Sequence, residues 1–235
     1  MADFNTHIFG AAAVSSLSAT LSSKLLSIPM PAALMLVAAG TIGGVLPDID
    51  LKDSTPSRLL FSMLGLLAAL AWLFAHMDAY TALELWLIAL GVFLAARYPM
   101  WWLFHTFTVH RGVLHSVLAA AMWGVLVAAA VHRILSVDAQ LSWLIAIFLT
   151  AGYLLHLLLD ELYSVDFMGV RIKRSFGSAL KLLDTRQLPA SCLVLFILLV
   201  AWLWTPELNS LTSLLSMLED DWPGALWPDW LTNAL

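Results

Sequence analysis

Residues 141–162, LSWLIAIFLTAGYLLHLLLDEL, are apolar up to a histidine and an aspartate near the end of the segment. An α-helix rises about 1.5 Å per residue and a bilayer core is about 30 Å thick, so about 20 mostly apolar residues can cross it. The segment therefore predicts a membrane-spanning helix. His156 and Asp160 are four residues apart, which places both side chains on one face of that helix. Because ionisable groups are costly in hydrocarbon, we expect this face to point into the protein.

The composition of the chain excludes an ordinary soluble protein. Of its 235 residues, 61% are hydrophobic and 11% are charged, whereas a soluble domain carries roughly 25% charged residues. The mean hydropathy is +0.89. A net charge of −5 without a dense basic patch argues against a nucleic-acid binder, and a single cysteine argues against a disulfide scaffold.

Further apolar segments predict an all-α, polytopic integral membrane protein with about seven transmembrane helices plus interfacial helices. The clear spans are 29–46, 58–76, 80–96, 112–132, 141–162 and 189–205, and the more polar segment 7–27 is expected to be the seventh. Residues 99–108 (PMWWLFHTFT) predict a separate helix at headgroup level. We expect one transmembrane domain over 1–206 and an amphipathic interfacial tail over 207–235.

The basic residues predict the orientation of the chain in the membrane. If the polar connection 163–188 faces the cytoplasm, counting spans backwards places nine of the eleven Lys and Arg residues on that side: Lys52, Arg58, Arg97, Arg111, Arg171, Lys173, Arg174, Lys181 and Arg186. The N-terminus is then cytoplasmic and the tail lies outside.

The same topology brings seven possible metal ligands to the cytoplasmic face, and we expect them to form one site: His7, Asp48, Asp50, His110, His115, His156 and Asp160. A mixture of imidazoles and carboxylates suits Zn, Mn or Fe better than Mg or Ca. We therefore expect one or two divalent ions, with Zn favoured. Seven candidates exceed one tetrahedral site, so either two metals share carboxylates or some of these groups serve as orienting residues and general base.

The local sequence around these candidates predicts their backbone setting. His7 is expected just before the first helix. The run GGVLPDID (43–50) should end a helix at its glycines and place both aspartates on bent, non-helical backbone. In HRGVLHS (110–116), we expect His110 and Arg111 on a loop and His115 in the first turn of the next helix.

Three histidines are expected to lie outside the site. His76 and His132 fall at the opposite membrane face and serve as natural controls, with interfacial snorkelling as their expected role. His105 belongs to none of the motifs, and we expect it to be a hydrogen-bond partner between helices.

Four motifs in order carry a family resemblance: THxxxG (Thr6, His7, Gly10), GxxxPDID (43–50), HRGxxHS (110–116) and HxxxD (156–160). Over residues 6–160 the chain resembles the YdjM-like family of LexA-regulated inner-membrane proteins, which are regarded as metal-dependent hydrolases. The resemblance implies a prokaryotic inner-membrane protein whose His and Asp residues at these positions bind a metal. After HxxxD, family members often have a short loop ending in Trp-Pro-Phe, whereas this chain has the longer, basic segment 161–184.

The leading functional hypothesis is a metal-dependent hydrolase that acts on a lipid-borne or membrane-proximal ester, with a phosphoester favoured. Asp48 or Asp50 would be the general base, and Arg111 would hold a substrate phosphate. Lys173 and Arg174 would steer an anionic headgroup, or would only set the topology. Membrane lipids are the expected partners.

Two alternatives come from other functional classes. A metal-ion or proton transporter would also use buried His and Asp residues, but it needs polar groups near the middle of the membrane. A non-catalytic membrane module would use the metal to join helices, and its coordination would be closed.

Overall fold

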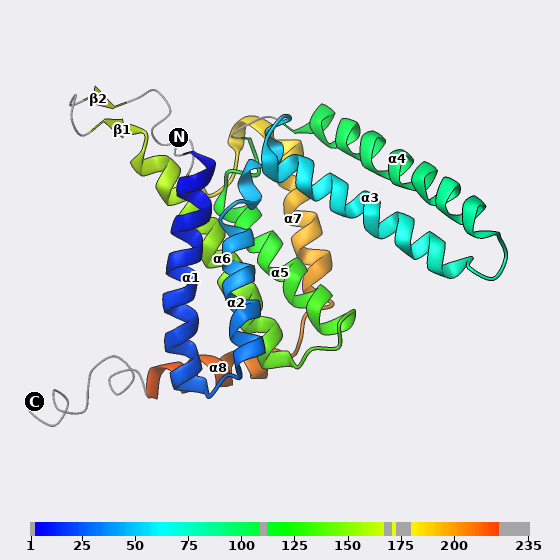
Figure 1. Ribbon diagram of the computed structural model, residues 1–235. Coiled ribbons are helices and arrows are strands. Elements are labelled where there is room, and N and C mark those ends of the chain that lie inside the picture. The colour runs from blue at the N-terminus through cyan, green and yellow to red at the C-terminus, as the bar shows by residue number, and fades with distance from the viewer. Residues whose placement is uncertain (1–2, 109–111, 167–170, 173–179, 221–235) are drawn as a thin grey trace, which may run out of the picture. The chain divides into compact units, whose positions relative to one another are not determined.

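The computed structural model describes residues 3–108, 112–166, 171–172 and 180–220. Within these residues the chain forms eight α-helices, which confirms the all-α class (Figure 1). Two short strands, Val165–Asp166 (β1) and Arg171–Ile172 (β2), pair antiparallel. The helices belong to two compact units. The first comprises residues 1–47 and 113–235, and the second residues 48–112.

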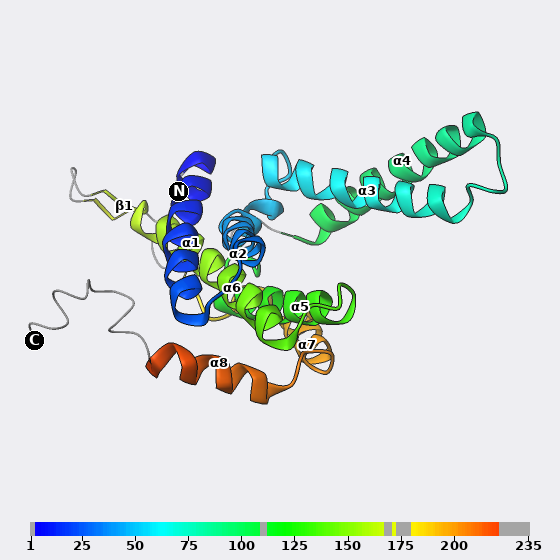
Figure 2. The ribbon, with the colours of Figure 1, turned by 60° about the horizontal axis from the view of Figure 1, so that its bottom comes forward.

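Helix α6 (Ala139–Leu162) is the centre of the first unit. It packs against α1, α2, α5 and α8, and helix α7 packs against α5 (Figures 1 and 2). Its sequence predicts this position, because apolar residues surround the helix, and twelve of its residues are buried. The other helices of the unit are α1 (Phe4–Leu26), α2 (Met30–Gly43), α5 (Val117–Arg133), α7 (Leu188–Trp202) and α8 (Leu208–Asp220).

Glycines allow α2 and α6 to touch through their backbones. A Cβ atom at Gly152 of α6 would overlap the carbonyl oxygen of Gly40, and a Cβ at Gly43 of α2 would overlap the carbonyl oxygen of Leu149. Small residues at helix interfaces are the usual means of close packing where lipid removes the hydrophobic drive between helices. The register between α2 and α6 is therefore closely constrained.

The second unit is a helical hairpin made of α3 (Thr55–Ala75) and α4 (Ala82–Phe107). Ser54 caps the start of α3 by accepting from the backbone N–H of Ser57 at 3.1 Å, and Glu84 accepts from the backbone N–H of Thr81 at 2.9 Å at the start of α4. The rings of Phe61 and Phe104 lie 5.4 Å apart between the two helices.

Four helices of the described residues are long and apolar enough to cross a membrane, by length and composition: 55–75, 82–106, 139–162 and 185–202. This supports a polytopic membrane protein. The expected spans at 29–46 and 112–132 correspond to shorter apolar helices, α2 with 14 residues and α5 with 17. The expected span at 7–27 corresponds to α1, whose Ser and Thr residues make it less apolar.

The prediction of a separate helix over residues 99–108 is wrong. Helix α4 continues through Pro99 to Phe107. Proline removes one backbone hydrogen bond but is tolerated in membrane helices where neighbouring groups compensate. The residues after it are held by α3, since the Ser57 hydroxyl and His105 Nε2 are 2.9 Å apart and the His105 and Phe61 rings are 6.0 Å apart.

Candidate metal centre

Four predicted ligands come together at one end of the first unit. The first turn of α1 carries His7, the last turns of α6 carry His156 and Asp160, and His115 lies just before α5. The ends of these helices that carry the four residues lie at the same end of the unit (Figure 1). All four side chains are buried, with exposures of 1% for His7 and His156 and 0% for His115 and Asp160.

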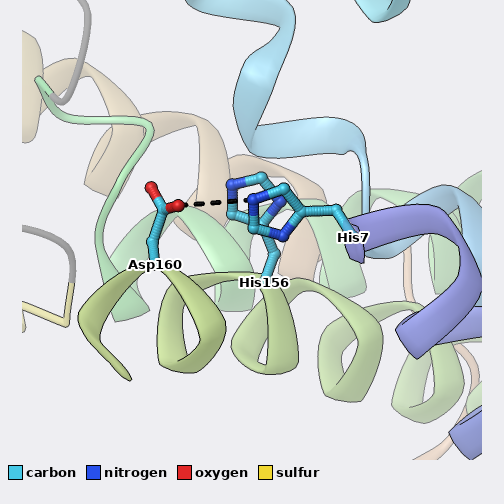
Figure 3. A group of neighbouring side chains, drawn as sticks. All are labelled: His7, His156 and Asp160. Atoms are coloured by element: carbon cyan, nitrogen blue, oxygen red, sulfur yellow. Dashed lines mark ion pairs between the residues drawn. The ribbon is translucent and has the colours of Figure 1, made fainter. Parts of the chain in front are cut away.

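His7, His156 and Asp160 form the core of the cluster (Figure 3). The imidazole rings of His7 and His156 are stacked, with centroids 3.7 Å apart and an angle of 16° between the planes. His7 Nε2 lies 3.3 Å from Asp160 Oδ1. The i, i+4 spacing of His156 and Asp160 thus directs both side chains toward α1, as the sequence predicts.

His115 approaches the same carboxylate from another element. Its Nε2 lies 3.9 Å from Asp160 Oδ2, and its ring centroid is 5.7 Å from that of His156. The backbone next to it is held on both sides: the Tyr153 hydroxyl donates to the carbonyl of Leu114, and Ser116 caps α5 by accepting from the N–H of Ala119 at 3.2 Å. The expectation that His115 lies in the first turn of the helix is wrong, because Ser116 is the better N-cap.

A backbone carbonyl orients His156. Its Nδ1 lies 2.8 Å from the carbonyl oxygen of Gly44, just after α2. Because a carbonyl oxygen only accepts, Nδ1 carries the proton and Nε2 presents its lone pair. Metal-binding histidines commonly donate their other ring nitrogen to such a group. Gly44 was predicted only to end a helix. Its second role is to orient His156 through its carbonyl. A Cβ at Gly44 would overlap Ala11 of α1, so a glycine is needed where α1 and the end of α2 approach each other.

The donor set fits a divalent metal ion. One ligand atom from each of His7, His156 and Asp160 lies within 4.8 Å of the others. Neither ring nitrogen of His7 forms a hydrogen bond among the described residues, although the side chain is 1% exposed and Nε2 lies 3.3 Å from Asp160 Oδ1. Buried polar atoms are normally satisfied, so these nitrogens point to a further ligand. Imidazole nitrogen together with carboxylate oxygen suits Zn, Mn or Fe.

Comparison with known proteins identifies the family. Residues 1–218 match the family model described as YdjM inner membrane protein. The chain belongs to the YdjM inner membrane protein family. The match continues beyond the four motifs and through the basic segment 161–184. No curated protein and no solved structure matches significantly.

The other candidate ligands of this YdjM-family chain belong to the second unit. Asp48 and Asp50 are on the 3₁₀-helix η1 (Leu46–Asp50), in the second unit, where the Asp48 carbonyl accepts from the Ser54 hydroxyl at 2.7 Å. The prediction of non-helical backbone there is wrong, although α2 does end at Gly43. Four predicted residues lie outside the described residues: His110, Arg111, Lys173 and Arg174.

The expected position of His7 before the first helix is also wrong. Asp3 accepts from the backbone N–H of Thr6 at 2.8 Å and starts α1 ahead of His7. An aspartate whose side chain accepts from the backbone N–H three residues later is a common N-cap and marks the start of a helix. His7 is therefore placed by a regular helix that is in contact with both α2 and α6.

The three histidines expected outside the site have local partners. His105 pairs with the Ser57 hydroxyl between α3 and α4, which confirms its predicted role. His76 Nδ1 lies 2.8 Å from the carbonyl oxygen of Trp72, and His132 Nδ1 lies 2.9 Å from that of Val137. His132 is in the last turn of α5, whereas His115 precedes its first turn.

Proposed function

We propose that this protein is a metal-dependent hydrolase of the prokaryotic inner membrane that acts on a lipid-borne or membrane-proximal phosphoester at the cytoplasmic face. The observation that carries the proposal is the buried cluster of His7, His156 and Asp160 at one end of a helical unit. Buried ionisable groups in a membrane protein are costly and commonly mark function.

The proposed ligands within the first unit are His7, His115, His156 and Asp160, with Zn²⁺ favoured. Asp160 lies near the two histidines at its sides, His7 and His115, and its negative charge would balance part of the charge of the cation. The Gly44 carbonyl fixes the tautomer of His156, so that Nε2 is the ligand atom. The roles of Asp48 and Asp50 as ligand or base, of His110 as ligand, and of Arg111, Lys173 and Arg174 toward substrate stay predictions from the sequence.

A divalent ion bound by these residues would supply Lewis acidity to the scissile phosphoryl group. The chain's own contribution is to hold the donors in a fixed geometry before the ion binds. His7 is fixed by stacking on His156, and His156 by the backbone of α2. Such preorganisation reduces the reorganisation needed during reaction.

The proposed membrane arrangement has seven spans, with α1, α2 and α5 crossing alongside the four helices that are both long and apolar enough to span. A helix of 14 residues rises about 21 Å, less than the bilayer core, so α2 would need the adjoining residues of 29–46 to complete its crossing. The positive-inside bias would place the metal cluster in the cytoplasmic half of the membrane.

A structural metal site is the second candidate, and one observation favours it. The four side chains of the cluster are at most 1% exposed, and closed coordination is typical of metals that join elements of a fold. This function would make the ion necessary for stability but not for turnover.

One experiment separates the two functions. Metal-loaded wild type, His156→Ala and His76→Ala would be assayed in detergent for phosphate release from phosphatidic acid and for conversion of phosphatidylglycerol, with thermal stability measured in parallel. A hydrolase predicts turnover in wild type and His76→Ala, and loss in His156→Ala and after chelation. No turnover by the loaded wild type, together with a lower melting temperature after chelation, would instead establish the structural site. Failure of wild type to bind metal would overturn both.

A further inference from the structure

A small pocket in the second unit gathers basic and aromatic side chains near the start of α3. Its volume is about 150 Å³. Lys52 and Asp53 come from the segment before α3, and Arg58 from the first turns of α3. Arg97 and the aromatic residues Tyr98 and Trp101 come from α4. Every residue that lines the pocket belongs to the second unit, in which α3 and α4 run side by side (Figures 1 and 2).

Aromatic rings orient two of the three cations. Lys52 Nζ lies 5.0 Å from the centroid of the Trp101 ring, and Trp101 Nε1 in turn donates to the Lys52 carbonyl at 3.3 Å. Arg97 Cζ lies 5.0 Å from the Tyr98 ring and 5.8 Å from the Phe93 ring. A cation above a ring face is attracted to it without losing its charge. Arg97 Nη1 also donates to the Tyr98 hydroxyl at 3.5 Å, which leaves its other N–H groups and the Lys52 ammonium able to bind an anion.

Among the described residues, the cations of the pocket outnumber its carboxylates. Lys52, Arg58 and Arg97 form no ion pair with a carboxylate among the described residues, where the ion pairs involve other side chains. Asp53 is the single carboxylate that lines the pocket, against three cations. Guanidinium groups bind phosphate through paired N–H donors, so this composition suits a phosphate group.

The residues around the pocket are of the kinds found at the headgroup level of a bilayer. Both α3 and α4 are long and apolar enough to span a membrane, and they expose large apolar side chains such as Leu59, Met63 and Trp102. Arg97 lies inside α4, where its Cβ packs near Gly65 of α3, and a long basic side chain at such a depth reaches toward the headgroups. Tyr and Trp are also typical of that level of the bilayer.

We propose that this pocket binds the phosphate of an anionic phospholipid whose acyl chains lie along the α3–α4 hairpin. The site is built from residues that play no part in the proposed hydrolase chemistry, and its test does not depend on metal. The ligand's phosphate contacts Arg58 and Arg97, while Lys52, held by Trp101, adds a third positive charge.

The test uses the full chain in a neutral detergent and compares three added ligands. Phosphatidylglycerol and phosphatidylcholine with identical acyl chains would be titrated, and inorganic phosphate would be added at matched concentrations. Bound lipid is counted by native mass spectrometry, and the melting temperature is measured. Wild type should retain phosphatidylglycerol in preference to phosphatidylcholine, and inorganic phosphate should neither compete with it nor stabilise the protein.

Variants then locate the site. One basic residue near an anionic headgroup contributes enough affinity for about a five-fold effect, so Arg97→Gln should weaken phosphatidylglycerol binding about five-fold and Arg58→Gln/Arg97→Gln about thirty-fold. Lys24→Gln, which removes an exposed cation of α1, should leave binding unchanged. Arg58→Lys/Arg97→Lys keeps both positive charges and should retain most of the preference for phosphatidylglycerol. It replaces the glutamine variant in the comparison if that variant fails to fold.

Three results would overturn the proposal. The first is equal binding of the two lipids by wild type, which needs no variant. The second is undiminished phosphatidylglycerol binding by folded Arg58→Gln/Arg97→Gln. The third is stabilisation by inorganic phosphate equal to that by phosphatidylglycerol, which would assign the pocket to a soluble phosphate compound.

Discussion

At the scale of single residues, the imidazole of His7 presents the sharpest physical problem. It is almost completely buried; among the described residues its Nδ1 has no hydrogen-bond partner, and its Nε2 makes the 3.3 Å contact with Asp160 without forming a hydrogen bond. Leaving a buried polar group unsatisfied costs about 1–3 kcal/mol. The neighbouring imidazole of His156 and carboxylate of Asp160 supply the chemistry that would let a cation offset this cost.

His156→Ala and Asp160→Asn should each strongly lower the metal content of the purified protein, because each removes one of the clustered donors. His76→Ala and His132→Ala remove histidines whose Nδ1 atoms lie against local backbone carbonyls, so their metal content should equal that of wild type. Elemental analysis of folded protein checks this. Equal loss in all four variants would contradict the assignment of the cluster.

His7→Phe should have opposite effects on metal binding and on the stability of the metal-free protein. Phenylalanine keeps an aromatic ring against His156 but carries no nitrogen that must be satisfied, so metal content should fall while the metal-free protein becomes more stable by about 1 kcal/mol. Thermal unfolding of the chelated proteins, together with elemental analysis, measures both. A metal-free variant that is less stable than metal-free wild type would argue that His7 has a structural hydrogen-bonding role.

At the scale of secondary-structure elements, the pairing of α2 with α6 supports the cluster. The contact between Gly40 and Gly152 lies about one turn from the contact between His156 and Gly44. A displacement of either helix would therefore separate Nδ1 from its carbonyl. The packing of small residues and the orientation of a ligand are two properties of the same interface.

Gly152→Ala should lower the free energy of unfolding by about 1–3 kcal/mol, because its Cβ would overlap the Gly40 backbone, which cannot move like a flexible side chain. Metal content should fall with it, since α6 carries two of the donors. Gly91→Ala is the matched control. A Cβ there meets nothing within 4 Å, so this variant should be neutral or slightly more stable. Unfolding in detergent that gives equal values for both variants would contradict the close contact.

The extended segment before α7 stabilises the start of α5. The carbonyls of Lys181 and Leu182 accept from the N–H groups of Val117 and Leu118 at 2.9 and 3.0 Å, which satisfies donors that a helix start leaves without intrahelical partners. Asp184 holds this segment by accepting from Lys181 Nζ and from the Arg186 N–H, both at 3.0 Å.

Asp184→Asn should therefore destabilise the protein by about 1 kcal/mol at neutral pH. Burial opposes ionisation of Asp184, but the hydrogen bonds from Lys181 and Arg186 outweigh it and hold the pKa of the carboxyl below its usual range. Because the folded pKa is the lower one, this stabilisation is present above the ordinary pKa of about 3.9 and is lost as the pH falls through the folded value. Melting curves of both proteins should differ at pH 7 and converge at the acidic end. A difference that persists there would contradict an electrostatic cause.

Helical periodicity explains what could be predicted of the fold and the site. The spacing of His156 and Asp160, the end of α2 at Gly43 and the helix–helix role of His105 follow from local rules of helix geometry, and the structure confirms them. The errors at His7 and His115 arose because the caps Asp3 and Ser116 were not recognised. The error at Pro99 had a tertiary cause, since contacts with α3 keep the helix continuous. No local pattern indicates that the Gly44 carbonyl would face an imidazole 112 positions later.

At the scale of the whole molecule, the distribution of charge makes the clearest prediction. The proposed seven crossings would place the two ends of the chain on opposite sides of the membrane, and the bias of basic residues predicts a cytoplasmic N-terminal end. A fluorescent reporter that matures only in the cytoplasm should be active when fused to the N-terminus, and alkaline phosphatase should be active when fused after residue 235. Both ends on one side would mean that one of the shorter or more polar helices, α1, α2 or α5, does not cross.

The order in which the helices are synthesised has a consequence for the buried cluster. α1 and α2 leave the ribosome early, whereas α6 follows only after α3, α4 and α5. During this interval His7 has neither the ring of His156 nor the carboxylate of Asp160 beside it. The Gly44 carbonyl likewise lacks its donor, His156 Nδ1. Metal capture is therefore expected to be a late event of biogenesis, and a nascent chain arrested before α6 should bind no metal through these residues. The bound ion would then report that insertion of the first six helices is complete.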